Sequence, residues 1–342
     1  MERPLAHLTL RACGGAAVLL GAMLTSTLTG AAQPADQSAP QDSRQLQEVR
    51  VTASKFDRRT LKRVAIQFVK AHGAVSPVIH QIGRWQADVC PQVTGLEPAA
   101  STLVSRRVKE VARSVGAPTR GVGKRCAVNV EIVFTPEPQQ LLNHIAKVYP
   151  ALLGSSRSSG DTTFHHAIQS WYLTGTRAVE GWNPPTDNGD AGKLMAIQEE
   201  IDESTPGGVD RGGGLRVDPP YGQGFAGFGL AGSYVTKGLT SEFLHVLVIV
   251  DANKVAGDSL RSISDYIAML TLTRVGSLDG CSRLPSVIDL LSSGCDERDK
   301  PQALTDADTA YLKALYSSDL EMNLNIELGD MRDRMVTSIM GR

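Results

Sequence analysis

Apolar side chains recur at helical spacing along much of the chain. In residues 60–72 they fall on one face of a 3.6-residue helix, at Leu61, Val64, Ala65, Phe68 and Val69. The same spacing, together with start and stop signals, predicts further helices over residues 101–115, 136–149, 193–202, 260–273, 285–292, 305–317 and 320–339. The last of these carries an apolar stripe that is typical of a core-facing or partner-facing helix, at Leu320, Leu324, Leu328, Met331, Met335 and Ile339.

Alternation of apolar and polar residues predicts strands between these helices. Residues 126–134 and 167–179 are two such segments, and residues 242–251 include an apolar, β-branched run of the kind found in buried strands. Residues 233–235 are expected to pair with the segment 242–251 across a turn near Lys237 and Gly238. Together these elements predict an α+β fold in one domain over residues 48–340, a mixed sheet with helices packed on one side.

Residues 181–232 interrupt the regular pattern with many glycines and prolines. A loop of this length is unusual in a compact domain and is often functional or disordered. We expect residues 204–232 to be exposed and to border a ligand groove, because they hold few apolar anchors. Glycine-rich runs also bind phosphate, but this one has no accompanying Walker lysine, which argues against a nucleotide site.

The first 32 residues have the pattern of a signal peptide. Arg3 and Arg11 precede a short apolar run, and small residues lead up to a predicted cleavage after Ala32. A membrane anchor is the alternative, although the run is shorter than the roughly 20 residues of a spanning helix. Cys13 lies before the apolar run, which argues against lipidation. We expect a periplasmic or secreted protein with a flexible linker over residues 33–47.

Residues 47–53, Gln-Glu-Val-Arg-Val-Thr-Ala, resemble the TonB box at the start of TonB-dependent receptors. That box is recognised by strand addition to an exposed edge. An ordinary alternating strand is the other interpretation of this segment, and the sequence leaves its role open.

Four cysteines remain after the leader: Cys90, Cys126, Cys281 and Cys295. An even number in an exported chain indicates disulfides. Three pairings are possible, and we favour Cys90–Cys126 and Cys281–Cys295 because each pair brackets a local unit. A metal site is the rival interpretation, but the chain has no C-x-x-C pair.

The charge balance limits the classes of partner. The chain has 35 basic and 36 acidic residues, whereas nucleic-acid-binding surfaces usually show a basic excess. No second apolar stretch approaches the length of a transmembrane helix. We therefore expect neither a nucleic-acid partner nor a transmembrane segment in the mature chain.

The region from residue 241 to residue 317 resembles the C-terminal half of the metzincin-type zinc peptidases. The quoted elements are the helix Ser264–Arg274, the segment Pro285–Asp289 and the run Leu304–Asp308 leading to Leu315 and Tyr316. In that family a helix with the motif H-E-x-x-H-x-x-G-x-x-H precedes a Met-turn and an L-T-x-x-D helix. The resemblance also includes residues 126–134, and it implies a zincin-like fold. The strand-helix-Cys-helix layout also resembles that of uncharacterised secreted bacterial proteins.

The resemblance implies a lost zinc motif. Ser264 and Ala268 correspond to the two helical histidines and Asp265 to the general base, with Thr271, Arg274 and Ile288 at the Gly, third-His and Met-turn positions. Zinc requires imidazole, thiolate or carboxylate ligands, and Ala268 has none. We therefore expect no zinc on this helix. The alternative is that Thr305 and Asp308 simply form the capping box of an ordinary helix.

Other side chains that could take part in catalysis or binding are scattered along the sequence. His144, His165, His166 and His245 lie on segments expected to be ordered, and a structural role is favoured for each. A Ser-His-Asp triad is assembled only in three dimensions and stays open, although the chain has no G-x-S-x-G elbow. Asp251 and Asp265 with Glu242 could hold a cation, but the calcium-loop pattern is missing. Three aromatic residues could line a groove: Trp171, Tyr172 and Trp182. Aromatic residues on strands are more often part of the core.

These observations favour an exported, non-catalytic binding or structural module with a peptide or protein partner. We assign no catalytic residue, no metal and no cofactor. The candidate groove residues are His165, Trp171, His245, Asp251 and Asp265. The alternative is an unrecognised hydrolase with His245 or His165 as its base. The sequence does not indicate the ligand or the oligomeric state.

Overall fold

A computed structural model describes residues 56–76, 79–120, 126–158, 162–178, 239–320 and 322–341. The predicted leader, the linker, the TonB-box-like segment, the helix 193–202, the strand 233–235 and the glycine-rich segment lie outside these residues. No helix in the described part of the chain is long and apolar enough to cross a membrane.

The described elements form a four-stranded mixed sheet with helices. The strands are β1 (Pro91–Thr94), β2 (Val130–Thr135), β3 (Ile168–Ala178) and β4 (Leu239–Asp251). The helices are α1 (Arg58–His72), α2 (Pro98–Val115), α3 (Pro138–Val148), α5 (Leu260–Leu272), α6 (Asp306–Ser317) and α7 (Leu324–Met340), with short 3₁₀ helices η2 (Pro150–Ser158), η3 (Val287–Leu291) and η4 (Glu297–Asp299). The predicted α+β class is confirmed at this level.

The strand order is β1-β2-β4-β3. β1 pairs parallel with β2, and β2 pairs parallel with β4. β3 is antiparallel to β4, with a register irregularity between Leu173 and Thr174. β4 is therefore a central strand, and α5 follows it after a short connection.

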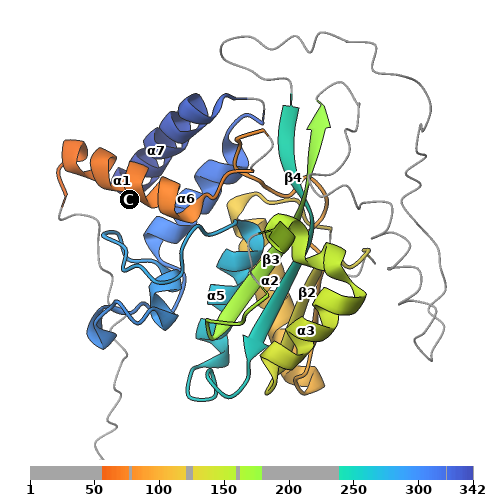
Figure 1. Ribbon diagram of the computed structural model, residues 1–342. Helices are drawn as coiled ribbons and strands as arrows, with labels where there is room; N and C mark the ends of the chain where they lie inside the picture. Colours follow the sequence, from red (N-terminus) through yellow and green to blue (C-terminus); the bar gives the residue numbers. More distant parts are fainter. Residues whose placement is uncertain are drawn as a thin grey trace, which may run out of the picture. The chain divides into compact units, whose positions relative to one another are not determined.

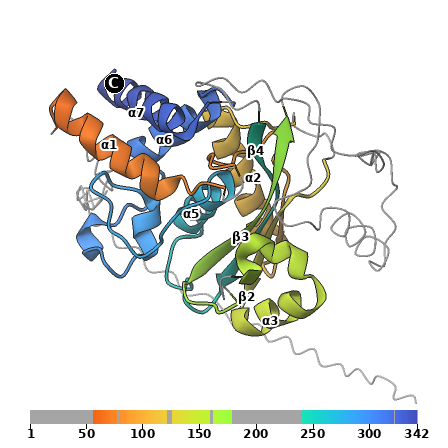
Figure 2. The ribbon, with the colours of Figure 1, turned by 45° about the horizontal axis from the view of Figure 1, so that its top comes forward.

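Helices cover both faces of this sheet, so the prediction of helices on one side is wrong. Val246, Val248 and Val250 of β4 belong to the main core with α1, α2, α5, α6 and α7. Leu247 and Ile249 belong to a second cluster that contains Trp171 and side chains of α3 and η2. Figures 1 and 2 show α3 on the side of β3 and β4 away from α5. Residues 246–250 of β4 are apolar at every position, and such a run needs cover on both faces.

Several element boundaries differ from the prediction for identifiable reasons. α2 begins at Pro98 rather than at Ser101, because proline is favoured in the first helical turn. Its C-cap Gly116 is left-handed (φ 87°), as expected for a helix stop. The predicted helix 285–292 is the 3₁₀ helix η3, which keeps its capping box. His165 and His166 lie in the loop before β3 rather than on a strand.

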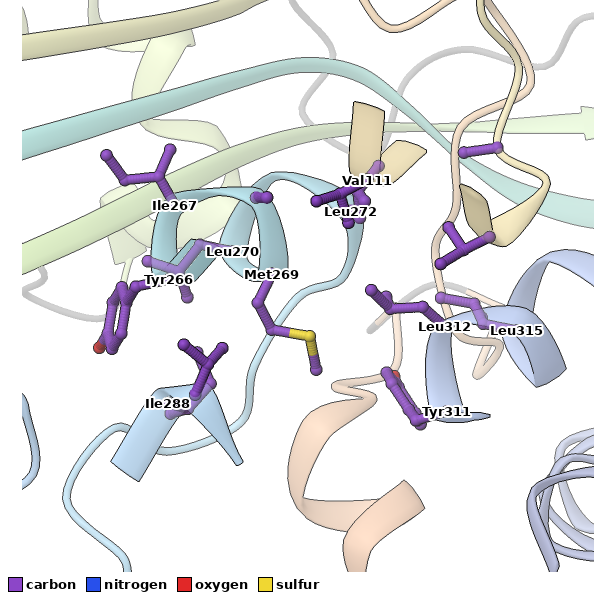
Figure 3. Packing of buried hydrophobic residues seen from close by; sticks show 14 of the residues in the cluster. Val111, Tyr266, Ile267, Met269, Leu270, Leu272, Ile288, Tyr311, Leu312 and Leu315 are labelled. Atoms are coloured by element: carbon purple, nitrogen blue, oxygen red, sulfur yellow. The ribbon is translucent and has the colours of Figure 1, made fainter. Parts of the chain in front are cut away.

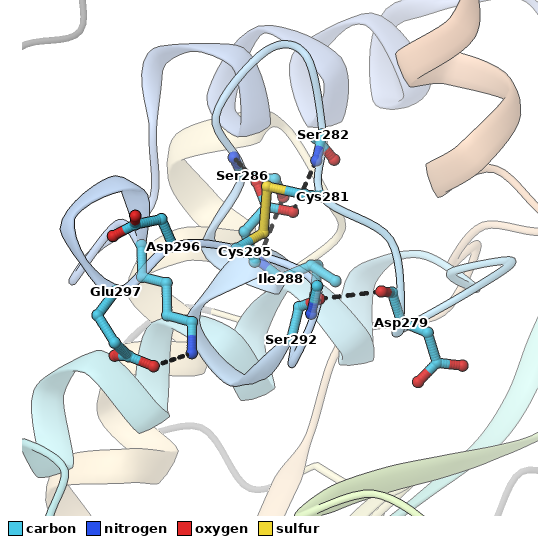
Figure 4. Close-up of a disulfide and its surroundings, with 12 residues drawn as sticks. Asp279, Cys281, Ser282, Ser286, Ile288, Ser292, Cys295, Asp296 and Glu297 are labelled. Atoms are coloured by element: carbon cyan, nitrogen blue, oxygen red, sulfur yellow. Dashed lines mark hydrogen bonds and ion pairs between the residues drawn. A yellow bond between two sulfur atoms is a disulfide. The ribbon is translucent and has the colours of Figure 1, made fainter.

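Both predicted disulfide pairs are confirmed. Cys90 and Cys126 are at bonding distance, as are Cys281 and Cys295. The first bridge links the segment before β1 to the segment before β2, and the second closes the loop that contains η3 (Figure 4). Pairing cysteines that enclose a local unit of the chain therefore gave the correct one of the three possible pairings.

Candidate functional site

Helix α5 is enclosed on every side. Its N-cap Ser259 accepts a hydrogen bond from the Ser262 amide, and every side chain from Ser262 to Leu272 is buried. Met269 extends from α5 into the space between Ile288 and Tyr311 (Figure 3). A helix that is buried all round is a core element. It offers no side chain at these positions to a substrate.

The positions that the metzincin resemblance would assign to a zinc motif make internal contacts. The Ser264 hydroxyl donates to the Leu260 carbonyl at 2.6 Å, and the Thr271 hydroxyl donates to the Ala268 carbonyl at 2.9 Å. Ala268 itself is fully buried in the main core and has no donor atom. Because zinc needs imidazole, thiolate or carboxylate ligands, this set does not fit the metal.

Asp265, which the metzincin resemblance would assign to the general base, is held by an ion pair. Its Oδ1 accepts from the Arg107 guanidinium of α2, and its Oδ2 accepts from the Leu304 amide at 3.1 Å. The Asp265 side chain is 0% exposed and that of Arg107 is 21% exposed. The carboxylate therefore joins α5 to α2 and to the segment before α6, and it has no free path to a water or substrate.

The segment Pro285–Asp289 and the start of α6 each contain a capping box. Ser286 with Asp289 caps η3, and Thr305 with Asp308 caps α6. Asp308 also reaches across the joint, where it accepts from Val287 N at 2.8 Å. The local capping pattern predicted from Thr305 and Asp308 is thus present, and the same carboxylate oxygen, Oδ2, extends it to a tertiary contact.

A buried chain of polar side chains that sequence analysis missed runs through this joint. The Ser286 hydroxyl lies 2.6 Å from Asp308 Oδ1 and 3.1 Å from His72 Nε2, while His72 Nδ1 donates to the Phe68 carbonyl at 2.9 Å. His72, Ser286 and Asp308 are each 2% exposed or less. Their sequence separations are 214 and 22 residues. Only the Thr305–Asp308 spacing signalled any part of it.

This serine, histidine and aspartate differ from a hydrolase triad. In a triad the carboxylate orients the imidazole through Nδ1, whereas here Nδ1 binds a backbone carbonyl and the carboxylate binds the serine. Burial lowers the pKa of His72 to about 4 and raises the pKa of Asp308 above its usual range. With no exposed member, the set is a core network that joins α1, η3 and α6.

The five candidate groove residues do not come together. Trp171 is in the cluster under α3, and Asp265 is on α5 at the opposite face of the sheet. Asp251 ends β4 and accepts hydrogen bonds from the amides of its own turn. His165 is exposed in the loop before β3. They therefore do not define one binding surface.

The proposed cation ligands are also apart. Glu242 and Asp251 lie nine positions apart on the extended strand β4, which places their backbones roughly 30 Å from one another. Asp265 is already paired with Arg107. These three carboxylates do not form one site.

His245 is the most unusual of the predicted residues. It is 3% exposed on β4, and neither ring nitrogen has a hydrogen-bond partner. The nearest charged atom is Glu131 Oε1 of β2, 3.6 Å from Nε2. In the described part of the chain no hydroxyl or thiol is hydrogen-bonded to this ring, so a nucleophile activated by His245 is not in place.

An open groove lies elsewhere in the described structure, where the segment before β1 meets the ends of α2 and α6. Its volume is about 600 Å³. Its lining residues are Arg84, Trp85, Gln86, Gly116, Pro118, Tyr316, Ser318, Asp319 and Leu320. The lining residue Arg84 pairs with Glu327, and both side chains are less than 5% exposed. The groove contains none of the five predicted residues.

Comparisons with known proteins add no relative: no family model, no curated protein and no solved structure matches the chain.

Proposed function

We propose that this protein is an exported, non-catalytic binding or structural module on a degenerate zincin-like scaffold, with a peptide or protein partner. Three features support the kinship: an antiparallel edge strand beside a central strand, a helix directly after that central strand, and a turn beneath that helix followed by an L-T-x-x-D helix. The disulfides and the leader-like first 32 residues support export.

The observation that best supports the proposed non-catalytic role of this helix is the Arg107–Asp265 ion pair. A general base must reach the proton that it removes, directly or through one water. Asp265 is instead fully buried and bonded at both oxygens. The neighbouring Ser264 and Ala268 do not fit zinc, so this helix has neither the metal ligands nor the base of a peptidase.

The test is an activity assay on the oxidised, exported chain. The chain is incubated with a diverse peptide mixture, with and without added Zn²⁺, and the products are followed by mass spectrometry. We expect no cleavage above that of a heat-denatured sample. Cleavage lost in His245→Gln would support the alternative hydrolase, and cleavage lost in Asp265→Asn, with folding checked by thermal melting, would support a working zincin helix.

Export has a separate test. N-terminal sequencing of protein recovered from the periplasm should begin at Gln33, because the predicted cleavage follows Ala32. A chain that retains its first 32 residues and sediments with membranes would contradict this part of the proposal and support the membrane anchor.

A further inference from the structure

The second disulfide lies beside a buried carboxylate. One ligand-type atom from each of Cys281, Asp289 and Cys295 lies within 4.8 Å of the other two. Cys281 is exposed, whereas Cys295 is 9% exposed and Asp289 is 2% exposed. The cluster is therefore anchored in the core and open to solvent on one side. Figure 4 shows the bridge across the loop that holds Ser286 and Ile288.

Asp289 has a fixed geometry and spare acceptor capacity. Its Oδ1 accepts from Ser282 N at 3.1 Å, and its Oδ2 accepts from Ser286 N at 3.0 Å. The Ser282 side chain is a third hydrogen-bond donor to this carboxylate. An ionised carboxylate has about four lone-pair positions, so these three donors leave room for one further ligand. The turn of η3 thus orients the carboxylate before anything binds.

Within the described residues, no lysine or arginine forms an ion pair with Asp289. The titratable group that acts on it is the buried His72 imidazole, which burial disfavours in its charged form. Burial raises the pKa of Asp289 above its usual range because the charged form is poorly solvated. A bound cation would remove that penalty.

We propose that reduction of the Cys281–Cys295 disulfide creates a site for a thiophilic divalent cation of the zinc type. The ligands are the two Sγ atoms and the Asp289 carboxylate, and a solvent molecule completes the tetrahedron on the exposed side of Cys281. A dithiol reductant gives two electrons and two protons to the disulfide and is itself oxidised to a disulfide. The two thiol protons are then released as the metal binds.

The site differs from the one that a peptidase would use. It belongs to the loop around η3, not to α5, and it is formed only in the reduced chain. The metal would replace the covalent cross-link of the loop with a coordinate one. The proposal is independent of whether the protein has a catalytic function.

The experiment is a metal titration of the full chain. The chain is reduced with a dithiol, desalted without oxygen and titrated with Zn²⁺ against a chromophoric chelator. We expect one Zn²⁺ per reduced chain and none per oxidised chain. Co²⁺ in place of Zn²⁺ should give the sulfur-to-metal absorption of a thiolate site. Far-UV circular dichroism should show that the reduced chain keeps its fold.

Matched variants locate the ligands. The pair Cys281→Ser and Cys295→Ser should abolish binding, while Cys90→Ser with Cys126→Ser, which removes the other bridge, should retain it. Asp289→Asn should weaken binding at least about tenfold, and Asp279→Asn, which changes an exposed neighbouring acid, should not. Zinc retained without Cys281 and Cys295, a reduced chain that binds no zinc, or loss of the fold on reduction would each overturn the proposal.

Discussion

At the scale of single residues, polar groups in the core are matched to one another rather than to a substrate. Ser264 and Thr271 donate to backbone carbonyls of their own helix. Asp265 is paired across the helix interface with Arg107. Unpaired buried charges are costly, so each such pair constrains how the helices pack. In the described part of the chain, the buried side-chain atoms without a hydrogen-bond partner are both ring nitrogens of His245, the Ser241 hydroxyl and Gln81 Oε1.

The Arg107–Asp265 pair gives a stability prediction. Arg107→Ala leaves the fully buried carboxylate of Asp265 without its cation. We expect the free energy of unfolding to fall by about 3–5 kcal/mol, measured by urea denaturation. Arg106→Ala is the matched control, because its side chain is 67% exposed and the change should cost less than about 1 kcal/mol. Equal effects of the two variants would contradict the structural role of the pair.

The core network gives a prediction for pH. The folded protein disfavours the charged form of His72, whose pKa falls to about 4, while the unfolded chain protonates it near 6.5. The unfolded state therefore binds more protons between these values, and the free energy of unfolding should decrease as pH falls from 6.5 to 4, by at most about 3 kcal/mol.

The facing acids reduce this effect. Asp289 and Asp308 have raised pKa values in the fold, so their protonation favours the folded state as pH falls. Unfolding curves of the wild-type protein and of His72→Gln, recorded from pH 6.5 to pH 4, measure the net change in the free energy of unfolding. We expect the pH slope to be smaller in His72→Gln and unchanged in the control His166→Gln, whose side chain is 31% exposed. An unchanged slope in His72→Gln would contradict the prediction.

At the scale of elements, one arginine holds together three segments. The Arg84 guanidinium donates to the carbonyls of Leu315 and Ser318 at the end of α6, and it pairs with Glu327 in the first turn of α7. The backbone of Ile82 also donates to Glu327. Because α6 ends without a glycine cap, its last carbonyls depend on this side chain.

Arg84 and Glu327 should therefore be strongly coupled. Arg84→Met should lower the free energy of unfolding by about 3–5 kcal/mol, since Glu327 then remains buried and unpaired. The double variant Arg84→Met with Glu327→Leu should be more stable than Arg84→Met alone. A double-mutant cycle by chemical denaturation measures this, and simple additivity of the two changes would contradict it.

At the scale of the whole molecule, sequence reasoning succeeded where the determinants are local. The apolar spacing of α1, the glycine stop of α2 and the capping box at Thr305 each depend on a few neighbouring residues. It failed where distant segments meet. Nothing in residues near His72 indicates Ser286. The second helical layer was also missed, although apolar residues on both faces of β4 require cover on both sides.

The two disulfides act on the whole molecule through the unfolded chain. They span sequence separations of 36 and 14 residues. In the chain-entropy model such cross-links stabilise the fold by about 4 and about 3 kcal/mol, because a longer loop restricts the unfolded ensemble more. We expect Cys90→Ala with Cys126→Ala to lower the free energy of unfolding more than Cys281→Ala with Cys295→Ala. Urea denaturation of the two variants under oxidising conditions measures the difference. The opposite order would indicate that the loop around η3 also depends on its bridge for native packing, beside Asp289.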